Sequence, residues 1–87
     1  MITATLENWR VEYIGISSIM IGDNNFRLIG ECFGDNKNRF RDGDVIITSL
    51  AMKYNPEEET VETLNSVYKL GKAENENESA FLKEITA

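Results

Sequence analysis

The sequence predicts a mainly β domain: a curled antiparallel meander or a small SH3-like or OB-like barrel of about five strands. A short C-terminal helix fits the same pattern, and an α+β domain is the alternative. Three observations support this class. Short segments rich in β-branched and aromatic residues alternate between apolar and polar positions. Turn-forming Gly, Asn, Asp and Pro residues separate these segments at short intervals. The 87 residues are enough for one small domain with a modest core.

The first strand is expected near residues 6–14, because Trp9, Val11 and Tyr13 fall on one face of an alternating segment. The large apolar side chains on this face predict that Trp9 belongs to the core. Residues 16–21 resume an extended pattern after Gly15.

A turn follows at residues 22–25, where the sequence reads GDNN. The return strand covers residues 26–33, and Gly30 inside it indicates a bulge or a sharp bend. Residues 34–44 form a long polar connection with turn signals at both ends.

Asp42 and Gly43 form a turn that leads into a strand at residues 45–49. Apolar residues occupy both faces of this strand, which predicts that it is covered on both sides or curls into a barrel. A second turn falls at residues 54–58, and the last strand is predicted as one bent segment over residues 60–70. We expect Leu64, Tyr68 and Leu70 on one face and Val61 and Val67 on the other.

The domain boundary is placed after Gly71: residues 1–71 form a single small β domain, and residues 72–87 form an acidic linker and a short helix. Residues 72–78 offer little apolar surface and are interpreted as solvated. Ser79 is a candidate cap for a helix whose apolar residues are Phe81, Leu82 and Ile85. Such a helix is too short to be stable alone, so it docks on this domain, docks on a partner or frays.

The net charge of −6 is unevenly placed. The chain is close to neutral up to Pro56, and the acidic residues beyond it are Glu57, Glu58, Glu59, Glu62, Glu74, Glu76, Glu78 and Glu84. Acidic surfaces repel nucleic-acid phosphates and attract basic proteins. We therefore predict a partner protein with a basic surface. The residues of this chain predicted to bind that partner are the acidic residues of the turn and of the strand just beyond it: Glu57, Glu58, Glu59 and Glu62.

A second candidate surface is basic. Lys37, Arg39 and Arg41 surround the aromatic Phe40, a combination that binds single-stranded nucleic acid in some proteins. Acidic residues flank this cluster closely, so nucleic acid is the less favoured partner.

The composition argues against catalysis, and we predict that the protein is not an enzyme. It has no histidine, and its single cysteine, Cys32, is expected to be a buried apolar residue rather than a nucleophile. Neither a metal site nor a cofactor is predicted. No secretory signal and no bilayer-spanning run is apparent, so we expect a soluble, cytoplasmic protein.

Two stretches resemble a pattern of small uncharacterised proteins encoded by phages and prophages. The first, FRDGDVIITS, contributes Phe40, Asp42, Gly43, Ile46, Thr48 and Ser49. The second, VETLNSVYKLG, contributes Thr63, Asn65, Ser66, Tyr68, Leu70 and Gly71. The resemblance covers residues 26–71 and agrees with the strands predicted there.

By size and charge the chain is also similar to anti-CRISPR and other anti-defence proteins, which implies an inhibitor of a host defence or nucleic-acid-handling protein. The leading hypothesis is a non-enzymatic protein-interaction module of this kind. The alternatives are a structural or accessory phage protein that self-associates as a homodimer, and a small nucleic-acid-binding β-barrel.

Overall fold

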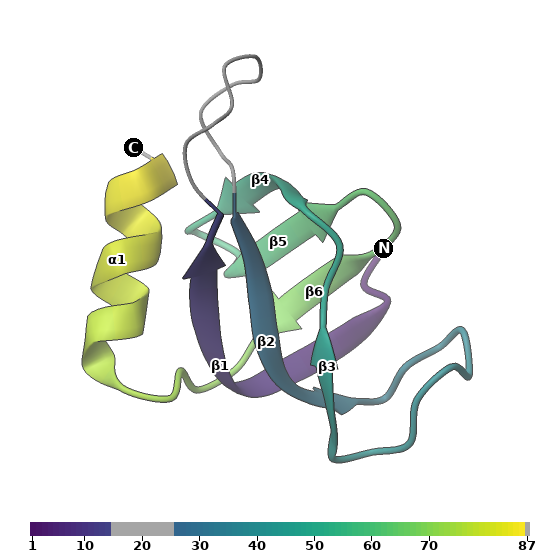
Figure 1. Ribbon diagram of the computed structural model, residues 1–87. Coiled ribbons are helices and arrows are strands. Elements are labelled where there is room, and N and C mark those ends of the chain that lie inside the picture. The colour runs from purple at the N-terminus through teal and green to yellow at the C-terminus, as the bar shows by residue number, and fades with distance from the viewer. Residues whose placement is uncertain (15–25, 87) are drawn as a thin grey trace.

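A computed structural model describes residues 1–14 and 26–86. These residues form six strands and one helix in a mainly β fold, which confirms the predicted class (Figure 1). The elements are β1 (Ala4–Tyr13), β2 (Phe26–Phe33), β3 (Asp44–Ile47), β4 (Ala51–Asn55), β5 (Thr60–Thr63), β6 (Val67–Leu70) and α1 (Glu76–Thr86). The predicted strand at residues 16–21 and the turn at 22–25 lie outside the described residues.

The six strands form one sheet in the order β3-β2-β1-β6-β5-β4. It consists of two antiparallel meanders, β1-β2-β3 and β4-β5-β6, joined where β1 and β6 run parallel. The sheet is therefore mixed and has six strands, whereas the sequence predicts about five strands in an antiparallel meander or a small barrel. Sequence patterning acts over a few neighbouring residues and carries no signal for this non-local parallel pairing.

The sheet must curl, because β3 and β4 occupy its two ends and only residues 48–50 connect them. A flat sheet of this order would separate its end strands by roughly 24 Å at the usual strand spacing. The connection can span only about 14 Å. Curling brings β4 against β2 and encloses the core, and Figure 1 shows β4, β5 and β6 behind β2 and β3.

A bulge in β1 aligns the two halves of that strand with the core. The register of β1 against β2 shifts between Glu7 and Arg10, and Asn8 has a positive φ of 51°. The extra residue lets both Leu6 and Trp9 point into the core, although an unbroken alternation would place them on opposite faces. Gly30 lies opposite the bulge, where a Cβ would lie 3.0 Å from the Trp9 Cβ. The bulge predicted from Gly30 is thus present, on the partner strand.

The predicted single strand over residues 60–70 is instead two strands, β5 and β6, joined by a tight turn. The Thr63 hydroxyl oxygen accepts hydrogen bonds from the backbone N–H groups of Asn65 and Ser66, which reverses the chain. Leu64 lies at this turn and is 62% exposed, so the face predicted for it is wrong. Residues 51–55, which the sequence analysis does not assign to a strand, form β4.

The core is a single cluster of buried side chains enclosed by the curled sheet and closed on one side by α1. Its members are Ala4, Leu6, Trp9, Phe26, Leu28, Cys32, Ile46, Ala51, Val61, Tyr68, Leu70 and Leu82. The predicted burial of Trp9 and Cys32 is confirmed.

Residues 71–75 run beside β1 after β6 ends, where the sequence analysis expects a solvated linker. The backbone N–H of Gly71 donates to the Leu6 carbonyl at 2.8 Å, and that of Glu74 donates to the Trp9 carbonyl at 2.8 Å. The Glu7 carboxylate accepts the N–H of Lys72 at 2.8 Å. This segment therefore continues the hydrogen bonding along the edge of β1 that β6 begins.

The helix α1 docks on this domain, which answers the question left open by the sequence. Asn75 caps it through a hydrogen bond from the Asn77 N–H to its side-chain oxygen at 2.9 Å, and the predicted cap Ser79 lies inside the helix. Leu82 is fully buried against the sheet. Phe81 meets Tyr13 edge to face with ring centroids 6.2 Å apart.

Candidate functional site

The turn between β4 and β5 carries the first group of predicted binding residues. The Asn55 side-chain oxygen accepts the backbone N–H groups of Glu57 and Glu58 at 3.0 and 3.2 Å, which fixes the turn. Lys69 donates from its ammonium group to the Glu58 carbonyl at 2.9 Å. We call Glu57, Glu58 and Glu59 the acidic turn. All three residues are exposed.

The fold separates the four predicted residues into three settings. Glu57 and Glu58 occupy the tip of the acidic turn. Glu59, at a positive φ of 54°, lines a cavity beside α1. Glu62 lies on the outer face of β5 and is opposite Lys53 of β4. Glu57, Glu58 and Glu59 remain neighbours on one turn, with Glu59 on its side toward α1. Glu62 belongs to a separate face of the sheet, where it lies opposite a lysine.

The loop that carries the basic cluster is organised around one buried carboxylate. Asp35 accepts the backbone N–H groups of Lys37, Arg39 and Phe40 at 3.2, 2.7 and 3.2 Å. The Arg39 guanidinium adds two further hydrogen bonds at 3.2 and 3.1 Å. The Asp35 side chain is only 1% exposed, and this hydrogen bonding holds its pKa far below the usual range.

Three of the four predicted nucleic-acid-binding residues make contacts within the chain itself. Arg39 is bound to Asp35, and its guanidinium carbon lies 4.9 Å from the centre of the Phe40 ring. Lys37 donates to the Asn65 carbonyl and, at 3.3 Å, to the Ser66 hydroxyl. Phe40 packs against the core. Arg41 remains as an exposed basic side chain of the cluster.

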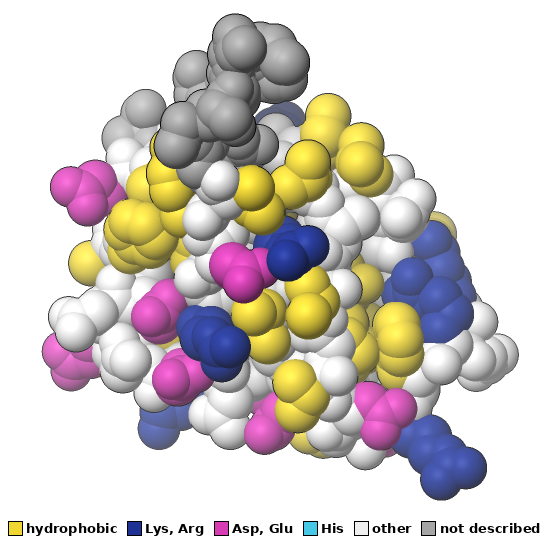
Figure 2. All heavy atoms as spheres, in the orientation of Figure 1, with side chains coloured by type: hydrophobic (Ala, Val, Ile, Leu, Met, Phe, Trp, Pro, Cys, Tyr) yellow, Lys and Arg dark blue, Asp and Glu magenta, His cyan; other side chains and the backbone are white. Residues whose placement is uncertain are grey.

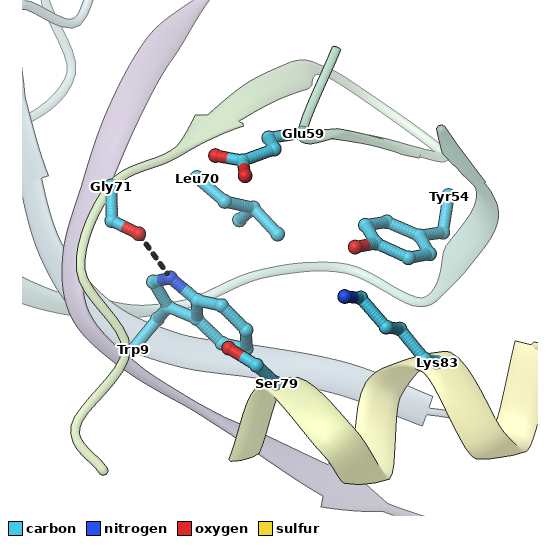
Figure 3. Close-up of a pocket in the computed structure, with 7 residues that line it drawn as sticks. All are labelled: Trp9, Tyr54, Glu59, Leu70, Gly71, Ser79 and Lys83. Carbon is cyan, nitrogen blue, oxygen red and sulfur yellow. Dashed lines mark hydrogen bonds between the residues drawn. The ribbon is translucent and has the colours of Figure 1, made fainter. Parts of the chain in front are cut away.

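Figure 3 shows a cavity between α1 and the sheet, lined by Trp9, Tyr54, Glu59, Leu70, Gly71, Ser79 and Lys83. The Trp9 indole N–H donates to the Gly71 carbonyl at 3.0 Å. Burial and the neighbouring Glu59 raise the pKa of the Tyr54 hydroxyl. The volume of about 70 Å³ has room for a few waters and is well below the ~300–1,000 Å³ of pockets that enclose small-molecule ligands.

An exposed apolar edge is a feature that the sequence analysis missed. The sequence predicts that the strand at residues 45–49 is covered on both faces or curls into a barrel. Ile46 and Thr48, on its inner face, are buried, but Val45 is 69% and Ile47 58% exposed. Figure 2 shows hydrophobic side chains following β3 on the viewer's face. A shallow groove of about 390 Å³ adjoins this edge and is lined by Asn8, Arg10, Ile29, Gly30, Glu31, Val45 and Glu74. Three apolar residues in a row signal a strand but do not tell which face is covered.

Within residues 1–14 and 26–86, no group of three or more Cys, Asp or Glu side chains is arranged to hold a metal ion. Burial and the nearby Asp35 raise the pKa of the Cys32 thiol. In the described part of the chain, no helix has the length and apolar character needed to cross a membrane.

The fold and these surfaces define a small mixed-sheet β domain with a docked C-terminal helix, an acidic turn and an apolar strand edge. No family model, curated protein or solved structure matches this chain. The resemblance to phage-encoded proteins stays a prediction from the sequence pattern.

Proposed function

We propose that this chain is a non-enzymatic protein-interaction module that presents the acidic turn to a basic surface of a partner protein. The observation that supports this proposal is that two of the side chains of the basic cluster are bound within the chain, whereas the carboxylates of the acidic turn form no ion pair with the described residues. The ion pairs among the described residues join Arg10 to Glu74, Arg27 to Glu12, and Arg39 to Asp35. None of these ion pairs neutralises a carboxylate of the acidic turn.

The basic cluster, by contrast, already forms hydrogen bonds within the chain. Lys37 and Arg39 donate to groups of the chain itself, and a fixed donor contributes less to a phosphate-binding surface than a free one. The arrangement therefore favours a basic protein over a nucleic acid. The inhibitor of a host nucleic-acid-handling protein implied by the resemblance is a specific form of this proposal, since such proteins carry basic surfaces.

A charge-neutralising variant tests the acidic turn. Glu57→Gln combined with Glu58→Gln should leave the fold intact, because exposed turn substitutions usually change stability by less than ~0.5 kcal/mol each. A matched control, Glu76→Gln combined with Glu84→Gln, removes the same charge from exposed positions of α1. Capture from a bacterial lysate is then compared for the wild type and both variants across salt concentrations.

The proposal expects a stoichiometric basic partner that is retained at low salt, released at high salt, and lost in the turn variant but not in the control. Capture that is equal for all three proteins, or no stoichiometric capture, argues against it. A gel-shift titration at low salt provides a second test. Micromolar binding of the wild type to single-stranded DNA or RNA would favour the basic cluster instead.

A further inference from the structure

The strand β3 lies at one end of the sheet order and pairs, within the described residues, with β2 alone. Edge strands of soluble proteins are usually shielded by lysine, proline, a bulge or a covering segment, because an open edge pairs with other chains. The exposed residues Val45 and Ile47 of β3 are β-branched and apolar. The only charged residue of β3, Asp44, accepts the Arg41 N–H at 2.9 Å and lies at its start.

The pairing of β3 with β2 shows which residues of β3 direct their backbone N–H and carbonyl groups toward β2 and which direct them toward the open edge. The Thr48 N–H donates to the Leu28 carbonyl at 2.9 Å, and Ile46 lies opposite Gly30 in the same register. Since antiparallel pairing alternates, the backbone groups of Ile46 face β2. Those of Val45 and Ile47 face the open edge.

We propose that this edge pairs with β3 of a second copy of the chain, antiparallel about a twofold axis at Ile46. In that register Val45 of each copy lies opposite Ile47 of the other, and both carry outward-facing N–H and carbonyl groups. Each such pair exchanges two backbone hydrogen bonds. The outward-facing backbone groups of Val45 and Ile47 in one copy therefore meet those of Ile47 and Val45 in the other, without any shift of register.

The side chains also match in this arrangement. Val45 and Ile47 project from the outer face of the sheet, where Glu31 and Ile29 of β2 are their neighbours. Across the two copies, each Val45 meets an Ile47, and β-branched cross-strand pairs stabilise sheets. Asp44 of each copy lies opposite Thr48 of the other, so no like charges are directly opposed.

The acidic turn does not take part in this pairing. It lies beside α1, since Glu59 lines a cavity with Ser79 and Lys83, and Figure 1 shows α1 and β3 on opposite sides of β1 and β2. Four edge residues bury far less than the ~1,200–2,000 Å² of a stable interface, so the dimer is reversible and forms at high protein concentration. It is independent of the proposed basic partner.

Sedimentation equilibrium over micromolar to millimolar concentrations is the first test. The mass of the wild type should rise from 9.9 kDa toward twice that value. Ile47→Lys should remain monomeric, because it places an ammonium group in the apolar row. Leu64→Lys, a change of the same kind at the exposed turn between β5 and β6, should dimerise like the wild type. A wild type that stays monomeric throughout, or an Ile47→Lys variant that dimerises equally, would overturn the proposal.

Amide hydrogen exchange of the wild type gives a second test that needs no variant. The amides of Val45 and Ile47 should exchange more slowly as the protein concentration rises. The amide of Ile46 is already bonded to β2 and should change much less. Exchange of Val45 and Ile47 that is independent of concentration contradicts the pairing, as does a slowing limited to α1 or the acidic turn.

Discussion

Asp35→Asn should destabilise the protein strongly, although it changes few atoms. The carboxylate accepts three backbone N–H groups and two hydrogen bonds from Arg39 at a site that water hardly reaches. Removing one partner of a buried ion pair costs about 3–5 kcal/mol. Arg39 is one-third exposed and can be partly rehydrated, and the amide oxygen keeps some of the backbone contacts. We therefore expect a loss of about 2–4 kcal/mol, a large part of the ~4–13 kcal/mol typical of a chain of this length.

The destabilisation should depend on pH in a defined direction. The pKa of Asp35 is lower in the folded protein than its usual value of ~3.9, so the folded state favours the ionised carboxylate. Its contribution to the free energy of unfolding is complete above that usual value and declines as the pH falls below it. The difference between the wild type and Asp35→Asn should thus be constant near neutral pH and shrink below about pH 4.

Urea unfolding followed by tryptophan fluorescence at neutral and acidic pH measures both effects. Asp44→Asn is the matched control, because Asp44 is an exposed aspartate whose carboxylate, among the described residues, accepts one hydrogen bond, from the Arg41 N–H. It should cost less than about 1.5 kcal/mol. A free energy of unfolding for Asp35→Asn within ~0.5 kcal/mol of the wild type would contradict a structural role for this carboxylate. A difference between the two proteins that stays the same in acid would contradict the lowered pKa.

Three further substitutions, one of them with a matched control, test the packing by urea unfolding. Trp9→Ala should lower the free energy of unfolding by about 3–5 kcal/mol, because it leaves a cavity in the core and removes the indole hydrogen bond to the Gly71 carbonyl. Tyr13→Ala, at a half-exposed site, should lower it less. Leu82→Ala should cost about 2–5 kcal/mol by detaching α1, and an unchanged midpoint would contradict the docking. Gly30→Ala should cost about 1–3 kcal/mol, since its Cβ would press on backbone atoms of the bulge; a neutral result would show that the bulge yields.

The acidic turn could be found from the sequence because its signal is local. Consecutive glutamates after Asn55 and Pro56 predict an exposed, charged turn in any fold. The settings of Glu59 and Glu62 could not be found, since they depend on how α1 and β4 pack against β5. The ion pair of Arg39 with Asp35 could not be predicted either. Its spacing from Asp35 is visible in the sequence, but the burial of that carboxylate arises only when the loop closes on the sheet.

Local patterning in the sequence was sufficient to predict the mainly β class, the long polar connection over residues 34–44 and the burial of Trp9 and Cys32; in the structure β3 already begins at Asp44. These predictions follow from residue type and alternation, which act over a few neighbouring positions. Packing between distant segments sets the parallel contact of β1 with β6, the division of residues 60–70 into two strands, and the docking of α1. It also determines that Val45 and Ile47 lie outside while Ile46 lies inside. Two-residue periodicity distinguishes the two faces of a strand, whereas the pairing of distant segments determines which of those faces the core covers.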